Sequence, residues 1–314
     1  MSKVQNYKAM RVLSLYARLQ EGQVIKKSEL AQEFNVNERS IQRDIEALRD
    51  FLADEHLNQT VVYDKRAKGY CLNQASSKSL SNSEILAVCK ILLESRSLRH
   101  DEMLPILDKL VDCCVPEANK AAVKGLLANE KYHYIAPHHD TPILPRLWEL
   151  GQAVQQHIVI EADYIKMNGD TVKRVLEPVG LMFSEYYFYL AAYIRNIDRA
   201  AEFANPDDDF PTIYRVDRIK SFKLLEERFH PSYAGRFEEG EFRKRVQFMY
   251  GGELQKVVFK YSGPSFEAVQ DRLPTAKIID ARDGVYTVRA EVFGKGIEMW
   301  LRSQGDYVSK VKFV

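Results

Sequence analysis

Two arginines one helical turn apart, Arg39 and Arg43, have the clearest chemistry in this sequence, and Ser40 lies between them. A guanidinium group can donate paired hydrogen bonds to a phosphate or to the edge of a guanine, and a serine hydroxyl can contact either. Asn37 and Gln42 complete the candidate set, with Gln42 nearer the flank. Residue types and spacing together indicate contact with DNA, provided that one helix positions them.

That helix is predicted from residue 38 onward. At 100° per residue, its apolar residues fall within about a 60° arc, and they are Ile41, Ile45, Leu48 and Leu52. Arg39 and Arg43 point the opposite way, and Asn37 is the expected N-cap, so both arginines lie in the first two turns. Glu46 and Asp50 lie further along the outer face and repel phosphate. We therefore expect only the N-terminal half of the helix to enter a DNA groove.

The flanking segments indicate a winged helix-turn-helix. Residues 28–34 are expected to form a short preceding helix, joined to the next by a tight connection. Residues 60–63 and 69–72 are strand-like and predict a hairpin with a basic tip, whose cations are Lys65, Arg66 and Lys68. Either segment alone is explained equally well by solvated surface charge. Their joint occurrence at winged-helix spacing favours DNA binding.

Composition narrows the classes of protein. A length of 314 residues allows two or three domains. The 45 Lys and Arg nearly balance the 44 Asp and Glu, so a nucleic-acid site must be a local patch. The cysteines lack paired metal-ligand spacing, and we expect them to be reduced and mostly buried: Cys71, Cys89, Cys113 and Cys114. With no run approaching the roughly 20 apolar residues of a membrane span, we expect a cytoplasmic protein without a metal site or cofactor.

Helices are expected after a small polar segment, residues 75–78, that marks the exit from the first domain. The first helix starts at a capping box, Ser81-Asn82-Ser83-Glu84. The predicted helices cover residues 82–94, residues 103–114, a segment after Pro116, and residues 144–156. They contain no polar group of residues typical of catalysis, and we interpret them as a linker that contributes to a dimer interface.

From His157 the apolar pattern changes to that of strands. The predicted strands are residues 158–165, 171–176, 178–183, 186–194, 212–216 and 219–225. Asn168-Gly169 is a strong signal for a hairpin turn. The density of these strands predicts a small, strongly bent sheet or partial barrel.

The C-terminal part alternates strands and helices. They are predicted at residues 254–261, 265–273, 276–281, 285–293, 297–304 and 307–313. Asp283-Gly284 is the expected hairpin turn, and Gly305 is the expected C′ residue of the second helix. The order β-α-β-β-α-β is ferredoxin-like. The fold class is therefore α+β multidomain, with a winged helix, a helical linker, a small bent sheet and a ferredoxin-like unit.

Nearly the whole chain resembles the WYL-domain transcriptional regulators of bacteria. The segments that carry the resemblance are Phe188-Tyr189-Leu190, with phenylalanine in place of the usual tryptophan, Val175–Leu181, Tyr214–Ile219, and Trp300–Gly305 near the end. The resemblance implies a winged helix-turn-helix at residues 1–75, a helical linker at 76–156, an Sm-like WYL ligand-sensing domain at 157–230, and a WCX-like domain at 231–314 that dimerises.

The resemblance also implies function. It implies a homodimer that binds an inverted-repeat operator in double-stranded DNA, and whose WYL domain senses a nucleic acid or a nucleotide-like effector. Residues that combine aromatic faces with cations suit such a ligand, and they are Tyr164, Lys166, Arg174, Tyr189, Arg215 and Arg218. A structural interpretation stays open for each, since Tyr189 can belong to the core and Arg218 can pair with Asp217.

Three functions follow from these patterns. The first is a sequence-specific regulator, with repression favoured over activation. The second is a transcriptional activator that responds to single-stranded nucleic acid. The third is a metal-dependent hydrolase built around His138-His139-Asp140. Three ligands in a row rarely reach one metal ion, and no Gly-rich phosphate loop or nucleophile elbow accompanies them. We therefore expect that the protein is not an enzyme.

Overall fold

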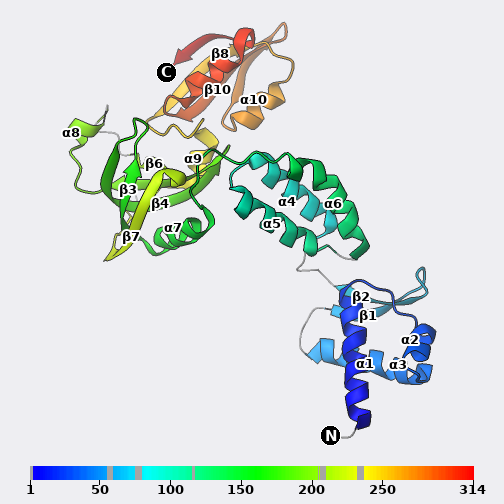
Figure 1. The fold of residues 1–314 in the computed structure, drawn as a ribbon. Helices are drawn as coiled ribbons and strands as arrows, with labels where there is room; N and C mark the ends of the chain where they lie inside the picture. Colours follow the sequence, from blue (N-terminus) through cyan, green and yellow to red (C-terminus); the bar gives the residue numbers. More distant parts are fainter. Residues whose placement is uncertain are drawn as a thin grey trace. The chain divides into compact units, whose positions relative to one another are not determined.

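The computed structural model describes residues 3–54, 59–74, 80–114, 117–203, 205, 210–231 and 237–314. The chain forms two compact units (Figure 1). The first comprises Met1–Arg96 and His100–Ile135, and the second comprises Ser97–Arg99 and Ala136–Val314. The predicted polar exit segment, residues 75–78, lies outside the described residues.

The first unit begins with a winged helix. Its elements are α1 (Lys3–Gln20), α2 (Lys27–Glu33), α3 (Glu38–Asp54), β1 (Gln59–Asp64) and β2 (Gly69–Gln74). β1 and β2 pair antiparallel, as the hairpin prediction requires. The four apolar residues of the predicted packing face of α3 are each at most 2% exposed. Helix α1 was not predicted, and it contributes Leu15 and Leu19 to the same core.

The first unit also contains the linker helices, α4 (Asn82–Ser95), α5 (His100–Asp112) and α6 (Glu117–Tyr132), which pack against one another. The predicted capping box is present. Glu84 donates its backbone N–H to the Ser81 hydroxyl at 3.3 Å, and its carboxylate accepts from the Ser81 backbone at 2.7 Å. All four cysteines are free. Cys89 and Cys114 are buried, whereas Cys113 is exposed, which differs from the expectation of burial.

The second unit contains an antiparallel five-stranded sheet in the order β6-β5-β4-β3-β7. Its strands are β3 (Ile158–Ile165), β4 (Thr171–Ser184), β5 (Tyr187–Ile194), β6 (Thr212–Arg215) and β7 (Ile219–Arg228). The predicted strands 171–176 and 178–183 are one strand, β4, whose register shifts between Pro178 and Gly180. Proline has no backbone N–H to donate, so a bulge at this position costs little pairing.

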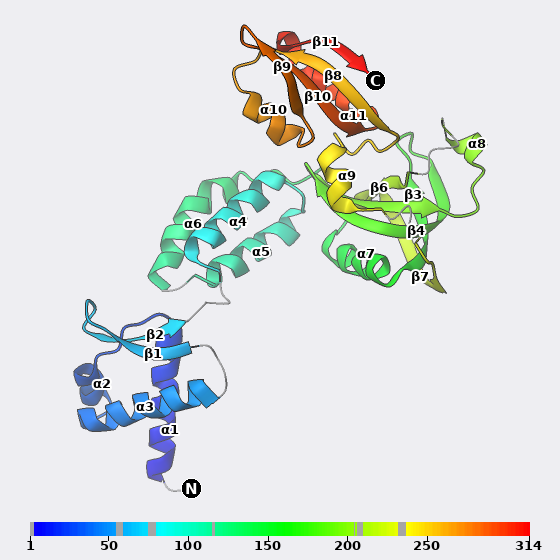
Figure 2. The same cartoon turned by 180° about the vertical axis from the view of Figure 1, so that it is seen from behind.

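Helices accompany this sheet. Helix α7 (Leu144–Gln156), which we grouped with the linker, packs against β4 and β3 (Figure 2). The domain boundaries given above stay predictions, but α7 belongs to the second compact unit and contacts its sheet. The short helix α8 (Arg199–Glu202) lies between β5 and β6 in the chain.

The C-terminal part of the second unit is ferredoxin-like, as predicted. Its elements are β8 (Leu254–Tyr261), α10 (Phe266–Arg272), β9 (Lys277–Arg282), β10 (Val285–Phe293), α11 (Gly296–Ser303) and β11 (Val308–Phe313). The strand order is β11-β8-β10-β9, the ferredoxin-like arrangement. The expected turn residues Asp283 and Gly284 have φ of 51° and 73°, and Gly305 has φ of 57°.

An unpredicted segment joins the two sheets. Helix α9 (Glu239–Arg245) brings Phe242 into an aromatic cluster with Phe210 and Phe293, at ring centroid distances of 5.0 and 5.8 Å. Residues 247–252, here called the connector, then lead into β8. Its close neighbours are Gly294 and Gly296, where an added Cβ would overlap the carbonyl oxygens of Gly251 and Gln247. The connector is therefore fitted directly onto the C-terminal part.

Candidate nucleic-acid interface and ligand cavities

The N-terminal end of α3 presents cations to solvent. Arg39 and Arg43 are exposed, and neither makes a hydrogen bond or an ion pair with any residue that the structure describes. Asn37 caps the helix, since its Oδ1 accepts from the Ser40 backbone at 2.8 Å and from the Ser40 hydroxyl at 3.0 Å. Asn37 and Ser40 thus help to fix the start of α3, while the two arginines stay available to a ligand.

Gln42 is not free in the same way. Its Oε1 accepts from Lys27 Nζ at 3.2 Å and from the Tyr70 hydroxyl at 3.0 Å, and its Nε2 donates to Glu46 at 3.1 Å. The side chain therefore ties α3 to α2 and to the hairpin. Gln42 is therefore a predicted DNA contact that the fold uses to hold α3 against its neighbours.

A buried ion pair, which the sequence analysis missed, orients α3. Asp44 is 1% exposed, and its carboxylate accepts from Arg11 Nε of α1 at 2.5 Å. The signal was a charged residue between the apolar positions Ile41 and Ile45 of the packing face. Arg49 adds a second restraint by donating to the Val61 carbonyl of β1 at 2.7 Å. These contacts hold the arginine-bearing end of α3 in a fixed relation to α1 and the hairpin.

The basic hairpin tip has a defined turn. Asp64 Oδ1 accepts from the backbone N–H groups of Arg66 and Ala67 at 2.7 and 3.2 Å. Lys65, Arg66 and Lys68 are exposed, and in the described part of the chain no carboxylate pairs with their side chains. Both predicted cationic surfaces of the winged helix are thus open to an anionic partner.

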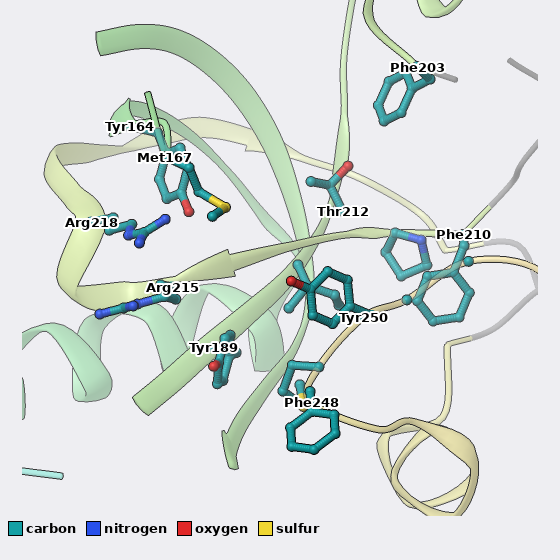
Figure 3. A pocket seen from close by; sticks show the side chains of 15 residues that line it. Tyr164, Met167, Tyr189, Phe203, Phe210, Thr212, Arg215, Arg218, Phe248 and Tyr250 are labelled. Atoms are coloured by element: carbon teal, nitrogen blue, oxygen red, sulfur yellow. The ribbon is translucent and has the colours of Figure 1, made fainter. Parts of the chain in front are cut away.

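The bent sheet and the connector enclose a cavity of about 460 Å³, here called the first cavity. Four of the predicted ligand residues line it, namely Tyr164, Tyr189, Arg215 and Arg218. In Figure 3, Arg215 and Arg218 lie on one side of this space, and Phe248 and Tyr250 of the connector lie on the other. Aromatic rings and cations therefore line one space, and their role in ligand binding stays a prediction.

The two arginines of the first cavity differ in their contacts. Arg215 makes paired hydrogen bonds with Asp217, Nε to Oδ1 at 3.1 Å and Nη2 to Oδ2 at 2.8 Å, and its guanidinium carbon lies 3.4 Å from the centre of the Tyr187 ring. Burial is the largest single influence and lowers the pKa of Arg215, but the hydrogen bond that it donates to Asp217, together with the charge of Asp217 and the neighbouring Tyr187 and Tyr189, leaves the pKa raised. Within the described residues, Arg218 has no such partner. The structural ion pair that we considered for Arg218 is formed by Arg215.

The family motif is divided between the faces of β5. Tyr189 lines the first cavity, and burial raises the pKa of its hydroxyl to about 12, with Arg215 opposing this. Leu190 is fully buried. Phe188, which replaces the usual tryptophan, pairs with Phe183 of β4 at a ring distance of 5.1 Å. The substitution thus lies in ring packing between β4 and β5, and Phe188 does not line the first cavity.

A second cavity, of about 210 Å³, adjoins the first and shares with it Tyr164, Phe203 and Thr212. The remaining two predicted ligand residues, Lys166 and Arg174, line this second cavity. The six predicted residues thus belong to two neighbouring spaces.

Two family models match this chain, an HTH domain at residues 11–70 and a WYL domain at residues 145–224. The chain carries a helix-turn-helix domain and a WYL domain. Both cavities are lined by residues of the WYL domain, and the first cavity also by the connector beyond it. No curated protein matches the chain.

One solved structure similar to this WYL-domain chain is proteasome accessory factor B/C (PafBC) of Arthrobacter aurescens, at 15% sequence identity and a TM-score of 0.30. The match covers 98% of this chain and 44% of that one, so this chain spans less than half of that protein's length.

The residues behind the hydrolase alternative, His138-His139-Asp140, precede the WYL match in the chain. The His139 ring is 6.4 Å from that of Tyr187. Over the described ranges, no three His, Cys, Asp or Glu side chains are placed to hold one metal ion. The two matched families are regulatory and not enzymatic. Of the helices that the structure describes, none has both the length and the apolar character to cross a membrane.

Proposed function

We propose that this protein is a DNA-binding transcriptional regulator whose operator affinity changes when the WYL domain binds a nucleic acid or a nucleotide-like ligand. The observation that carries the proposal is the pair of open cationic surfaces on the winged helix, at the start of α3 and at the hairpin tip. The match to an HTH domain over the same residues supports it.

On this proposal, the start of α3 enters the major groove. Arg39, Ser40 and Arg43 contact bases, and the hairpin cations contact flanking phosphates or the minor groove. Asn37 contributes by holding the helix start, and Gln42 by holding α3 against the hairpin. Glu46 and Asp50 are exposed further along α3 and oppose deeper entry, because both carry the same charge as DNA.

We further propose a homodimer with a twofold axis, formed through the ferredoxin-like part. Two winged helices related by such an axis read an inverted repeat, with half-sites about 10 bp apart or a multiple of it. Repression is the simpler outcome, because it requires only that an occupied operator overlaps a promoter. Activation requires an additional contact with the transcription machinery, and a promoter-reporter assay with and without the protein distinguishes the two.

The first cavity is the proposed effector site. Its volume lies within the roughly 300–1,000 Å³ of small-molecule sites. Tyr164 and Tyr189 supply aromatic faces for a base, and Arg218 is the cation for a phosphate or another anionic group. Arg215 holds the cavity wall through Asp217 and contributes its charge only in part.

The test is selection of bound duplexes from a random DNA library by the full-length protein. Arg39→Ala/Arg43→Ala removes the two free cations of α3. The matched control is Lys173→Ala/Lys223→Ala, which removes equal charge from two side chains of the bent sheet that are each 64% exposed, lie outside the proposed dimer interface and line neither cavity. We expect an inverted repeat with the wild type and the control, and none with the first variant. A motif that survives in the first variant contradicts the assignment of α3.

A further inference from the structure

We propose that the second cavity is a phosphate subsite, that the Glu202 carboxylate occupies it as an internal anion, and that a phosphate of the ligand displaces Glu202. This inference rests on the proposed sensing function of the WYL domain. It adds a mode of regulation, in which the unliganded protein blocks part of its own site.

The contacts of Glu202 define this subsite. Its Oε2 accepts from Arg174 Nη2 of β4 at 2.8 Å and lies 3.4 Å from Lys166 Nζ in the β3–β4 turn. Glu202 is the last residue of α8, so the carboxylate reaches the two cations from a different segment. All three residues line the second cavity. Both cations are thus directed at one oxygen, which stands where a ligand oxygen would lie.

The contact is exchangeable. The side chains of Lys166, Arg174 and Glu202 are 41%, 18% and 36% exposed, so solvent and solutes reach the ion pair. Ion pairs of this exposure stabilise a fold only weakly. The hydrogen bonds from Arg174 and Lys166 hold the pKa of Glu202 below its ordinary value, so the internal anion is ionised near neutral pH.

A phosphate suits these cations better than the carboxylate does. It carries a larger charge and three acceptor oxygens, and a guanidinium can donate two parallel hydrogen bonds to it. Two cations against one carboxylate leave an excess of one positive charge. The exchange therefore exposes the Glu202 carboxylate to water while the phosphate takes both donors.

Displacement of Glu202 is transmitted to the first cavity through Phe203. This residue follows Glu202 directly and lines both cavities. The Arg199 guanidinium lies 4.9 Å from the centre of the Phe203 ring. Helix α8 has only four residues and little stability of its own. The Asp198 carboxylate caps its start by accepting from the backbone N–H groups of Ala200 and Ala201, at the end opposite Glu202. A ligand with its base in the first cavity and its phosphate in the second would thus move α8 and the shared wall.

The experiment is calorimetric titration of the full-length protein with inorganic phosphate, thymidine 5′-monophosphate and thymidine. The main variant is Glu202→Gln, which removes the internal charge and keeps the shape. The matched control is Glu161→Gln, because Glu161 also accepts from two cations of this sheet, Lys173 at 3.3 Å and Lys223 at 2.8 Å, but lines neither cavity. A third variant, Glu202→Gln/Arg174→Ala, removes a cation of the subsite.

We expect Glu202→Gln to tighten binding of phosphate and of the monophosphate by about two- to fivefold, the range measured for exposed ion pairs. Thymidine affinity should not change, and Arg174→Ala should abolish the gain. The monophosphate should bind more tightly than inorganic phosphate if both cavities act together. An unchanged affinity in Glu202→Gln, or an equal gain in Glu161→Gln, overturns the inference.

The assay uses no DNA, so its result is separable from the proposed function. A gain in phosphate affinity without any selected DNA motif would leave the subsite established and the regulator proposal refuted. A selected motif without the gain would do the reverse.

Discussion

The buried pair Arg11–Asp44 leads to a quantitative prediction about the placement of α3. Arg11→Ala leaves the Asp44 carboxylate 1% exposed and without its cation. Removal of one partner from a buried pair costs about 3–5 kcal/mol, because the remaining charge loses both water and its counterion. The Arg11 side chain is itself 12% exposed, so some water can enter, and we expect the lower end, about 3 kcal/mol.

The matched control lies on the same helix. Arg18 also pairs with a carboxylate, that of Glu33 on α2, but these side chains are 32% and 47% exposed. Arg18→Ala should therefore cost only about 0–1 kcal/mol. The two substitutions remove the same side chain from the same helix and differ mainly in the burial of the charge left behind.

The assay is hydrogen exchange of the α3 backbone, followed by mass spectrometry of the full-length chain. A local measurement is needed because a chain with two compact units need not unfold in one transition. A loss of 3 kcal/mol corresponds to exchange about 100-fold faster, whereas the Arg18 control should change it by less than about fivefold. Equal effects of both substitutions would refute the reasoning from burial, and Arg11→Ala/Asp44→Asn should recover part of the loss.

Three further outcomes are expected. Arg43→Ala should weaken binding to a selected operator by about 1–3 kcal/mol and relax specificity at one base pair, whereas a loss uniform over all sequences would assign Arg43 to phosphate. Lys65→Ala should weaken all sequences alike and reduce the slope of log affinity against log salt by about 1 in a titration of binding with salt. Gly294→Ala should lower the melting temperature more than Gly284→Ala, with Trp300 fluorescence in a Trp148→Phe background as the probe, because the chain has two tryptophans. Both glycines have positive φ, but only at Gly294 would a Cβ overlap the connector.

Local patterns predicted much of the fold. The packing face of α3, the Ser81 capping box and the Asp283-Gly284 turn depend on neighbours within a few residues, and the structure contains all three. The order of strands and helices in the ferredoxin-like part could also be predicted, because the spacing of apolar residues differs between its strands and its helices. The continuity of β4 could not be predicted, because a bulge at Pro178 within one strand and a break between two strands look alike in sequence.

The sequence suggested aromatic and cationic residues for a ligand site, but it did not show which of them pair with carboxylates or that they line two separate cavities. Sequence separated Arg215 and Arg218 by only three positions, and nothing local assigns Asp217 to one of them. Glu202 lies 28 residues from Arg174, so its role depends on where the β5–β6 connection folds back. The sequence did not predict a role for the connector, because its close contacts are with Gly294 and Gly296, more than 40 positions away. Interactions of this kind require the tertiary fold.

One side of the first cavity is formed by the connector, which lies outside the WYL match. Phe248 packs on the core of the ferredoxin-like part, Met249 packs on the cluster around Phe242, and both line the cavity. Their φ of 52° and 56° hold these neighbouring side chains in two different cores. A fragment cut after β7 would thus lack one side of its binding space. If the first cavity is the effector site as proposed, exchange of the C-terminal part between related proteins would exchange ligand preference with it, and chimeras designed to move the proposed dimer interface alone would also change the proposed sensing.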